Sequence, residues 1–93
     1  MRAGRRRGGA LLITHALPTG AGRPARFGFV VPKNVGIAVR RNLVQRRLRA
    51  LCAERLAAGS TGVDIVVRAL PGSADASYDE LRAGLALQLE VIA

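Results

Sequence analysis

A long helical segment in the middle of the chain restricts the possible folds more than any other feature of the sequence. Residues 38–58 contain neither glycine nor proline, and Gly36 and Gly59 flank them. This pattern predicts a helix that begins near residues 36–38 and ends at Ala58. At 3.6 residues per turn one side of the helix is aliphatic, formed by Val44, Leu48 and Leu51. Other elements must cover that side.

Three apolar segments are predicted to be strands, namely residues 10–17, 26–31 and 63–70. The first precedes Pro18, and the third is rich in β-branched residues and almost continuously apolar, which is typical of a buried strand. In the second segment, alternation places Phe27, Phe29 and Val31 on one face. The two rings could stack on nucleobases, but the face they share with Val31 favours a place in the core.

A second helix is predicted near the C-terminal end of the sequence. Ser77 and Glu80 have the spacing of a capping box. The expected buried stripe follows, formed by Leu81, Leu85, Gln88, Leu89 and Ile92. The order strand, strand, helix, strand, helix predicts a small two-layer α+β sandwich, with one sheet and two helices on one face. A chain of 93 residues has room for one modest core.

The charges are distributed unevenly along the chain. Residues 1–53 hold twelve Lys and Arg and no acidic residue, whereas residues 54–93 hold three Arg and all six Asp and Glu. Fourteen of the fifteen cations are Arg, whose planar guanidinium matches phosphate oxygens. We therefore expect a polyanionic partner, with an anionic membrane surface as an alternative to nucleic acid. Residues 1–9 are predicted to be a flexible basic arm and residues 10–93 a single RNA-binding domain.

The central helix carries most of the candidate binding residues. Opposite its aliphatic side lie Asn42, Arg46 and Arg49, and residues 38–53 contain no acid. Two guanidiniums one turn apart could hold successive phosphates, and the Asn could bond a 2′-hydroxyl or a base edge. Arg40 and Arg47 point in a third direction and are expected to extend around the edge of the core, while Arg41 lies nearer the core side. The complete candidate set is Lys33, Arg40, Arg41, Asn42, Arg46, Arg47 and Arg49.

No group of residues indicates catalysis by the protein or a bound metal. His15 and Cys52 are the only residues of their types and fall in different predicted elements. We expect Cys52 to be a small buried residue of the helix and His15 to be a passive strand residue. The six acids show no pair with metal-site spacing, and no apolar run reaches the about 18 residues of a membrane span. The sequence therefore predicts a cytoplasmic binding protein without a cofactor of its own.

The segment from Lys33 to Arg49 resembles a family signature. The protein components of bacterial ribonuclease P carry a pattern close to K-x-x-G-x-A-V-x-R-N-x-x-K-R-x-x-R, and this chain keeps its register over seventeen residues. The matching residues are Lys33, Gly36, Ala38, Val39, Arg41, Asn42, Arg46 and Arg49. The resemblance covers roughly residues 4–93 and is to actinobacterial-like members. Gln45 departs from it, because the family usually has Lys at this position.

The resemblance implies both a topology and a function. The family has a left-handed crossover through the motif helix, whereas such connections are usually right-handed. Its members are subunits of the ribonuclease P endoribonuclease, one protein per RNA, and bind the catalytic RNA and precursor tRNA to support removal of the 5′ leader in tRNA maturation. The RNA subunit carries the chemistry with bound Mg²⁺, so the resemblance implies no catalytic residue in the protein.

A second departure concerns the start of the chain. Family members usually begin with a helix that forms one wall of a cleft against the sheet, and the resemblance implies that this helix is missing here. The cleft contacts the 5′ leader of precursor tRNA, so leader binding is expected to be impaired. The leader-contacting Tyr of the family corresponds to His15, with Thr14 as the other possible register.

Two other functions remain open at the level of sequence. A structural or ribosomal RNA-binding protein without a role in cleavage would show the same basic face. A DNA-binding protein could place the Arg-rich helix in a major groove, where Asn42 and Gln45 could read adenine. No second helix precedes this one, as a helix-turn-helix requires, which argues against the DNA-binding alternative.

Overall fold

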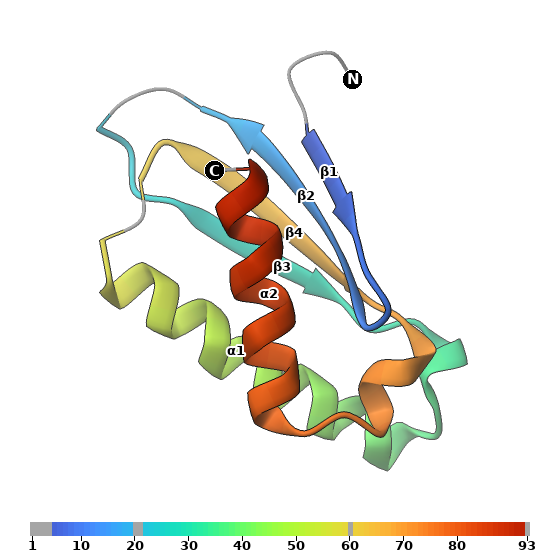
Figure 1. Cartoon of the computed structure of the whole chain (residues 1–93). Helices are drawn as coiled ribbons and strands as arrows, with labels where there is room; N and C mark the ends of the chain where they lie inside the picture. Colours follow the sequence, from blue (N-terminus) through green and yellow to red (C-terminus); the bar gives the residue numbers. More distant parts are fainter. Residues whose placement is uncertain (1–4, 20–21, 60, 93) are drawn as a thin grey trace.

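The computed structural model describes residues 5–19, 22–59 and 61–92, which form one sheet and two long helices. The elements are β1 (Arg5–Gly8), β2 (Leu12–Pro18), β3 (Arg26–Val30), the 3₁₀ turn η1 (Lys33–Val35), α1 (Ala38–Ala57), β4 (Val63–Ala69), the 3₁₀ turn η2 (Pro71–Ala74) and α2 (Tyr78–Ile92). The strand order is β1-β2-β4-β3, and both helices lie on the same face of the sheet (Figure 1). The predicted small α+β sandwich is confirmed, with one strand more than expected.

That additional strand is β1, in a segment for which the sequence predicted a flexible arm. β1 pairs antiparallel with β2, with Arg6 opposite His15. At the turn of this hairpin the backbone N–H of Gly9 donates to Leu12 O at 3.0 Å. The Arg- and Gly-rich composition shows no apolar alternation, but the backbone of β1 satisfies the outer edge of β2. Residues 1–4 of the expected arm lie outside the described residues.

The connection between the two parallel strands is left-handed. β3 and β4 are neighbours, with Phe27 beside Ile65 and Phe29 beside Val67, and α1 joins them. With the helices toward the viewer and both strands turned to point upward, β4 lies to the left of β3 (Figure 1). This hand is the opposite of that found in about 98% of such units, and it agrees with what the family resemblance implies.

One hydrophobic core lies between the sheet and the helices. The buried side chains of α1 include Val44, Leu48 and Leu51, as the helical period predicts. They meet Leu81, Leu85 and Leu89 of α2 and Leu12, Ala16, Ile65, Val67 and Ala69 of the sheet. Phe27 and Phe29 are half-buried against the same core, so their predicted place in the core is confirmed. Cys52 is buried as well.

Helix α2 begins with the predicted capping box. The backbone N–H of Ser77 donates to Glu80 Oε1 at 2.8 Å, and the N–H of Glu80 donates to Ser77 Oγ at 3.1 Å. These bonds satisfy backbone donors that have no partner within the helix. Four members of the predicted buried stripe are buried, and the side chain of the fifth, Ile92, lies outside the described residues.

Gln88 is the polar member of that stripe, and it joins α2 to β2. Thr14 Oγ1 donates to Gln88 Oε1, and Gln88 Nε2 donates to Leu12 O at 2.8 Å. Both polar side chains are buried. Because water cannot replace these bonds, they fix the position of α2 over the β1–β2 hairpin.

Candidate nucleic-acid interface

The outward face of α1 brings three of the candidate residues together. Asn42, Arg46 and Arg49 are all exposed and share the side of the helix opposite the core. With Val39, Leu43 and Gln45 they line an open hollow of about 480 Å³. Because residues 38–53 contain no acid, this surface has no carboxylate of its own helix to offset the two guanidiniums.

The segment before α1 gives this helix its start. Lys33 lies exposed in η1, and Gly36 follows with a φ of 153°, in the region that side chains other than glycine rarely adopt. A Cβ at Gly36 would lie 3.4 Å from the Arg40 side chain. Arg41 Nε donates to the Gly36 carbonyl at 3.2 Å. Both motif residues, Gly36 and Arg41, therefore shape the entry to the helix.

Arg40 and Arg47 have partners within the protein. Arg40 forms an exposed ion pair with Asp75 at 2.7 Å, and Arg47 donates to the carbonyl of Ala76 at 2.7 Å. Both bonds tie α1 to the loop before α2. The predicted third direction for these two side chains is confirmed, and the partly buried bond of Arg47 is the one that supports the fold.

Arg49 is restrained although it is exposed. Its guanidinium carbon lies 5.9 Å from the centre of the Phe29 ring on β3, a distance at which the ring attracts the cation. A restrained side chain loses less conformational entropy when it binds a ligand. Arg49 is therefore better prepared for phosphate binding than a fully mobile Arg.

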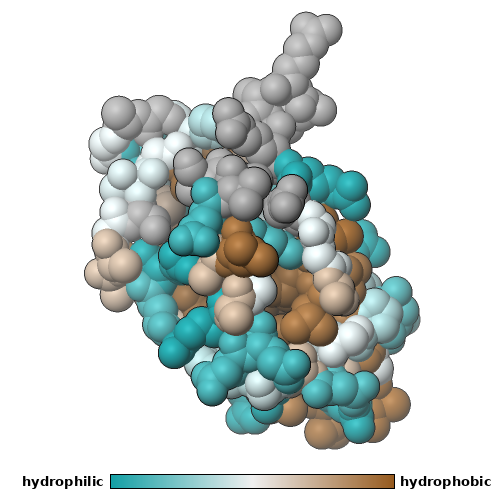
Figure 2. Space-filling model, viewed as in Figure 1, coloured by the Kyte–Doolittle hydropathy of each residue, from teal (hydrophilic) through white to brown (hydrophobic). Residues whose placement is uncertain are grey.

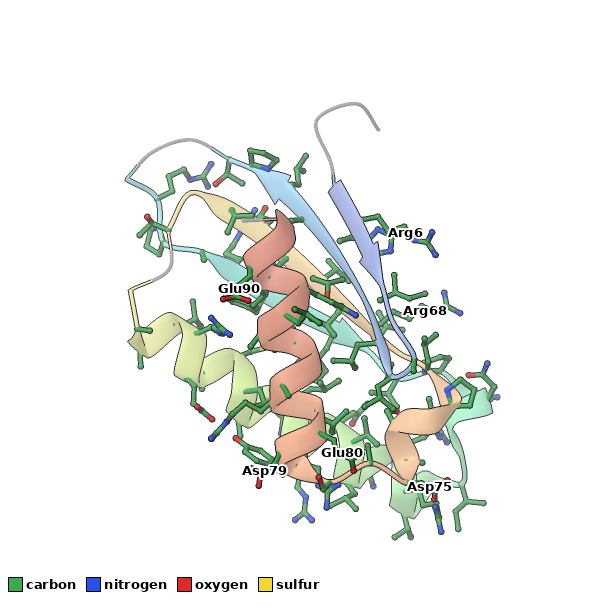
Figure 3. All side chains as sticks on the ribbon, viewed as in Figure 1. Arg6, Arg68, Asp75, Asp79, Glu80 and Glu90 are labelled. Atoms are coloured by element: carbon green, nitrogen blue, oxygen red, sulfur yellow. The ribbon has the colours of Figure 1, made fainter. Side chains whose placement is uncertain are left out.

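A second cationic surface lies on the sheet face that the helices leave uncovered. Because register places Arg6 beside His15 and His15 beside Val66, these side chains share that face, and Arg68 follows two residues later on β4. Arg6 and Arg68 extend outward from the sheet, away from the helices (Figure 3). Thr14 points the other way and is fully buried under α2. Of the two candidate registers for leader contact, only His15 is exposed to solvent.

Sequence reasoning missed Arg6 and Arg68. Arg6 fell in the expected flexible arm, so no strand face could be assigned to it. Arg68 stands alone in an apolar strand that was predicted to be buried on both sides. The sequence signal that could have found it is the even spacing of Asp64 and Arg68, which places the two charged residues of this segment on one face of a strand.

The uncovered face contains one acid, Asp64, and it is paired. Arg26 holds it with two hydrogen bonds, at 3.0 Å and 2.6 Å. The hydrogen bond from Arg26 is the main reason that the pKa of Asp64 lies below its usual value. Because Asp64 is already paired with Arg26, it does not offset the charges of Arg6 and Arg68.

Most other acids lie around α2, away from the outward face of α1. Asp75, Asp79 and Glu80 gather near the start of α2, and Glu90 lies near its end (Figure 3). Glu54 faces α2, where its Oε2 accepts bonds from the Tyr78 hydroxyl at 2.7 Å and from Arg82 at 2.9 Å. The hydrogen bond from Tyr78, followed by that from Arg82, lowers the pKa of Glu54. The outward face of α1 therefore keeps its positive charge, although Asp75 pairs with Arg40 near the start of the helix.

The described residues contain little that could perform chemistry. No group of three or more His, Cys, Asp or Glu side chains within 5–19, 22–59 and 61–92 lies close enough to hold a metal ion. Burial raises the pKa of the Cys52 thiol to about 11, which makes it a poor nucleophile at neutral pH. No helix in the same ranges is long and apolar enough to cross a membrane.

Over the helical face, hydrophilic side chains are interrupted by separate apolar patches (Figure 2).

Comparison of sequences places residues 1–92 in the family described as Ribonuclease P. The ribonuclease P protein component of Pseudarthrobacter chlorophenolicus is 51% identical over 82 residues, which cover 88% of this chain and 60% of that protein. That of Streptomyces bikiniensis is 45% identical over 98 residues, which cover 97% of this chain and 80% of that protein. The chain spans only 60% to 66% of the relatives from Pseudarthrobacter, Arthrobacter and Kocuria.

Two solved structures share the fold. The RNase P protein of Staphylococcus aureus matches with a TM-score of 0.83 at 21% identity, covering 97% of this chain and 82% of that one. The RNase P protein of Thermotoga maritima matches with a TM-score of 0.76 at 22% identity, covering 98% of this chain and 83% of that one. At these identities the likeness concerns the fold alone.

Proposed function

The chain belongs to the ribonuclease P protein family, and from this premise we propose that it is the protein subunit of a ribonuclease P. In this role it binds the catalytic RNA and precursor tRNA and supports removal of the 5′ leader in tRNA maturation. The observation that carries the proposal is the outward face of α1, where Asn42, Arg46 and Arg49 form one exposed, acid-free stripe. We refer to these three residues as the α1 stripe.

The α1 stripe binds the catalytic RNA. Arg46 and Arg49 lie three residues apart, which places their guanidiniums on neighbouring turns, where each neutralises a backbone phosphate. Asn42 adds a neutral donor and acceptor for a 2′-hydroxyl or a base edge. Lys33, exposed in η1 ahead of the helix, adds a further cation. Arg40, Arg41 and Arg47 take a smaller direct part, because their guanidiniums already bond within the protein.

The uncovered sheet face binds the leader of precursor tRNA. A single-stranded leader needs phosphate contacts and surfaces against which bases can lie. Arg6 and Arg68 supply the cations, and His15 and the exposed Val66 supply the flat and apolar surface between them. The sheet face and the α1 stripe lie on different sides of the molecule, so leader and catalytic RNA need not compete.

Catalysis belongs to the RNA subunit. His15 is exposed on a strand and Cys52 is buried in the core, so the described residues supply no nucleophile beside an assisting base. Magnesium ions held by the RNA supply the hydrolytic chemistry. The protein neutralises phosphates, stabilises the folded RNA and positions the leader, as one protein per RNA in the cytoplasm.

The test measures leader release from precursor tRNA by ribonuclease P RNA at low Mg²⁺, with and without the purified chain. We expect the chain to increase the rate of cleavage. The single variants Arg46→Gln and Arg49→Gln should each reduce this stimulation. Arg55→Gln is a matched control, because Arg55 lies on the same helix in the groove facing α2, and it should retain the stimulation.

The alternative is a structural or ribosomal RNA-binding protein without a role in cleavage. It is not favoured, because family membership and the motif segment both point to ribonuclease P. Tight binding of the catalytic RNA with no effect on leader release at any Mg²⁺ concentration would support that alternative. Binding no stronger than to duplex DNA would refute both functions.

A further inference from the structure

The hollow on α1 contains more than phosphate-binding groups, and we propose that it takes one unpaired nucleobase of the bound RNA, with adenine preferred. The inference rests on the proposed function and specifies the ligand of that same surface. The hollow is open to solvent and is lined by residues of α1 alone, so a base would lie against the helix rather than inside an enclosed pocket. Only two of its six lining residues, Arg46 and Arg49, are charged.

The first argument is the apolar part of the lining. Val39 is 75% exposed at the start of α1, and Leu43 lies one turn further along the helix. A phosphate gains nothing from covering an aliphatic side chain, because it must keep its hydration or meet polar donors. A flat base gains by removing such surface from water while its edge remains free for hydrogen bonds.

The second argument is the pair of amides. Asn42 and Gln45 line the hollow, and neither side chain is among those that form hydrogen bonds between described residues. Each amide offers a donor and an acceptor together, the combination that pairs with N6 and N7 of adenine.

The third argument is the position of the guanidiniums. Arg46 and Arg49 bound the hollow, and Phe29 restrains Arg49 from behind at 5.9 Å. They can hold the phosphates on either side of an inserted nucleotide, and a guanidinium plane can also stack on the base. The base must be unpaired, because the major groove of A-form RNA is too deep and narrow for side chains to read.

The test measures binding of the full chain to labelled oligouridylates that differ only at one central position. That position holds adenine, uracil or an abasic residue, so all probes have the same number of phosphates. We expect the adenine probe to bind about five- to ten-fold more tightly than the abasic probe, in line with the contribution of one stacked base. The uracil probe should fall between them.

Two variants and a matched control locate the effect. Val39→Ser and Gln45→Ala should each bring the affinity ratio of the adenine and abasic probes toward one. Neither removes a charge, so the slope of log affinity against log salt should stay unchanged. Ile37→Ser removes an equally exposed aliphatic side chain, 72% exposed, just before the helix and outside the hollow, and it should retain the adenine preference.

Equal affinity for the adenine and abasic probes would overturn the inference. So would a ratio that stays the same in both Val39→Ser and Gln45→Ala, because the base would then bind elsewhere. If that happens while the chain still stimulates leader release, only the nucleobase site is wrong. Loss of stimulation by the unaltered chain would instead refute the proposed function.

Discussion

Substitution of four arginines of α1 tests which of their guanidiniums bind the RNA. Arg46 and Arg49 are exposed on the α1 stripe, whereas Arg40 bonds Asp75 and Arg47 bonds a backbone carbonyl, each at 2.7 Å. Substitution to Gln at each position removes one charge and keeps a side chain of similar polarity. We expect R46Q and R49Q to weaken binding to ribonuclease P RNA more than R40Q and R47Q, because a guanidinium that is already paired must break that bond before it binds phosphate.

The magnitude follows from counterion release. Removal of one guanidinium that neutralises a phosphate should lower the slope of log affinity against log salt by about 0.7 to 0.9. Between about 50 and 200 mM salt, the advantage of the unaltered chain over R46Q or R49Q should therefore shrink about three-fold. R47Q should change the slope less, but it should lower the free energy of unfolding by about 1 kcal/mol, since it removes a partly buried hydrogen bond.

The assay is filter binding to the catalytic RNA over a salt series, combined with urea unfolding of each variant. R46Q and R49Q should lower the slope of log affinity against log salt with little effect on the free energy of unfolding. R47Q should lower the free energy of unfolding with little effect on the slope. If all four variants changed the slope equally, the charge of the helix would act as a whole. The assignment of separate roles to the two pairs would then be wrong.

Three further predictions concern the fold. Gln88→Leu leaves the buried Thr14 hydroxyl without its partner and removes one of the two hydrogen bonds to the Leu12 carbonyl, which keeps its bond from Gly9. It should lower the free energy of unfolding by about 2 kcal/mol in urea titration; unchanged stability would refute the role given to this link. Cys52, with a pKa raised to about 11 by burial, should resist thiol reagents at neutral pH in the native protein and react after unfolding, so rapid native labelling would contradict the structure. Arg26 lowers the pKa of Asp64, so the pair stabilises the fold above about pH 4 and this contribution is lost as the pH falls through the lowered folded-state pKa. The fall in melting temperature below about pH 4 should therefore be shallower in Asp64→Asn, and an identical fall in both proteins would contradict it.

Helix α1 could be predicted from sequence because both of its faces depend on one local rule. A period of 3.6 residues places Val44 and Leu48 on the core side and Arg46 and Arg49 on the opposite side, and the structure has the same arrangement. The capping box of α2 is equally local. The apolar strands followed from composition and alternation, which do not require knowledge of their neighbours.

The remaining features depend on contacts between distant segments. β1 becomes a strand because β2 offers it an edge, and nothing in the composition of residues 5–8 indicates this. The central place of β4 in the sheet and the hand of the crossover likewise arise from packing, and the hand was expected only from the family resemblance. The partners of Arg40 and Arg47 lie 35 and 29 residues away, beyond the reach of any local pattern.

The order in which the strands pair has a consequence for synthesis of the chain on the ribosome. β4 is the neighbour of both β2 and β3, and the bond between Thr14 and Gln88 spans 74 residues. Every cation of residues 1–53 is translated before the first acid. Residues 1–53 are therefore made as a strongly positive segment before β4 and α2 exist to complete the fold. The sheet and its core can form completely only after α2 has been made, because contacts between distant segments must wait for the later of the two partners.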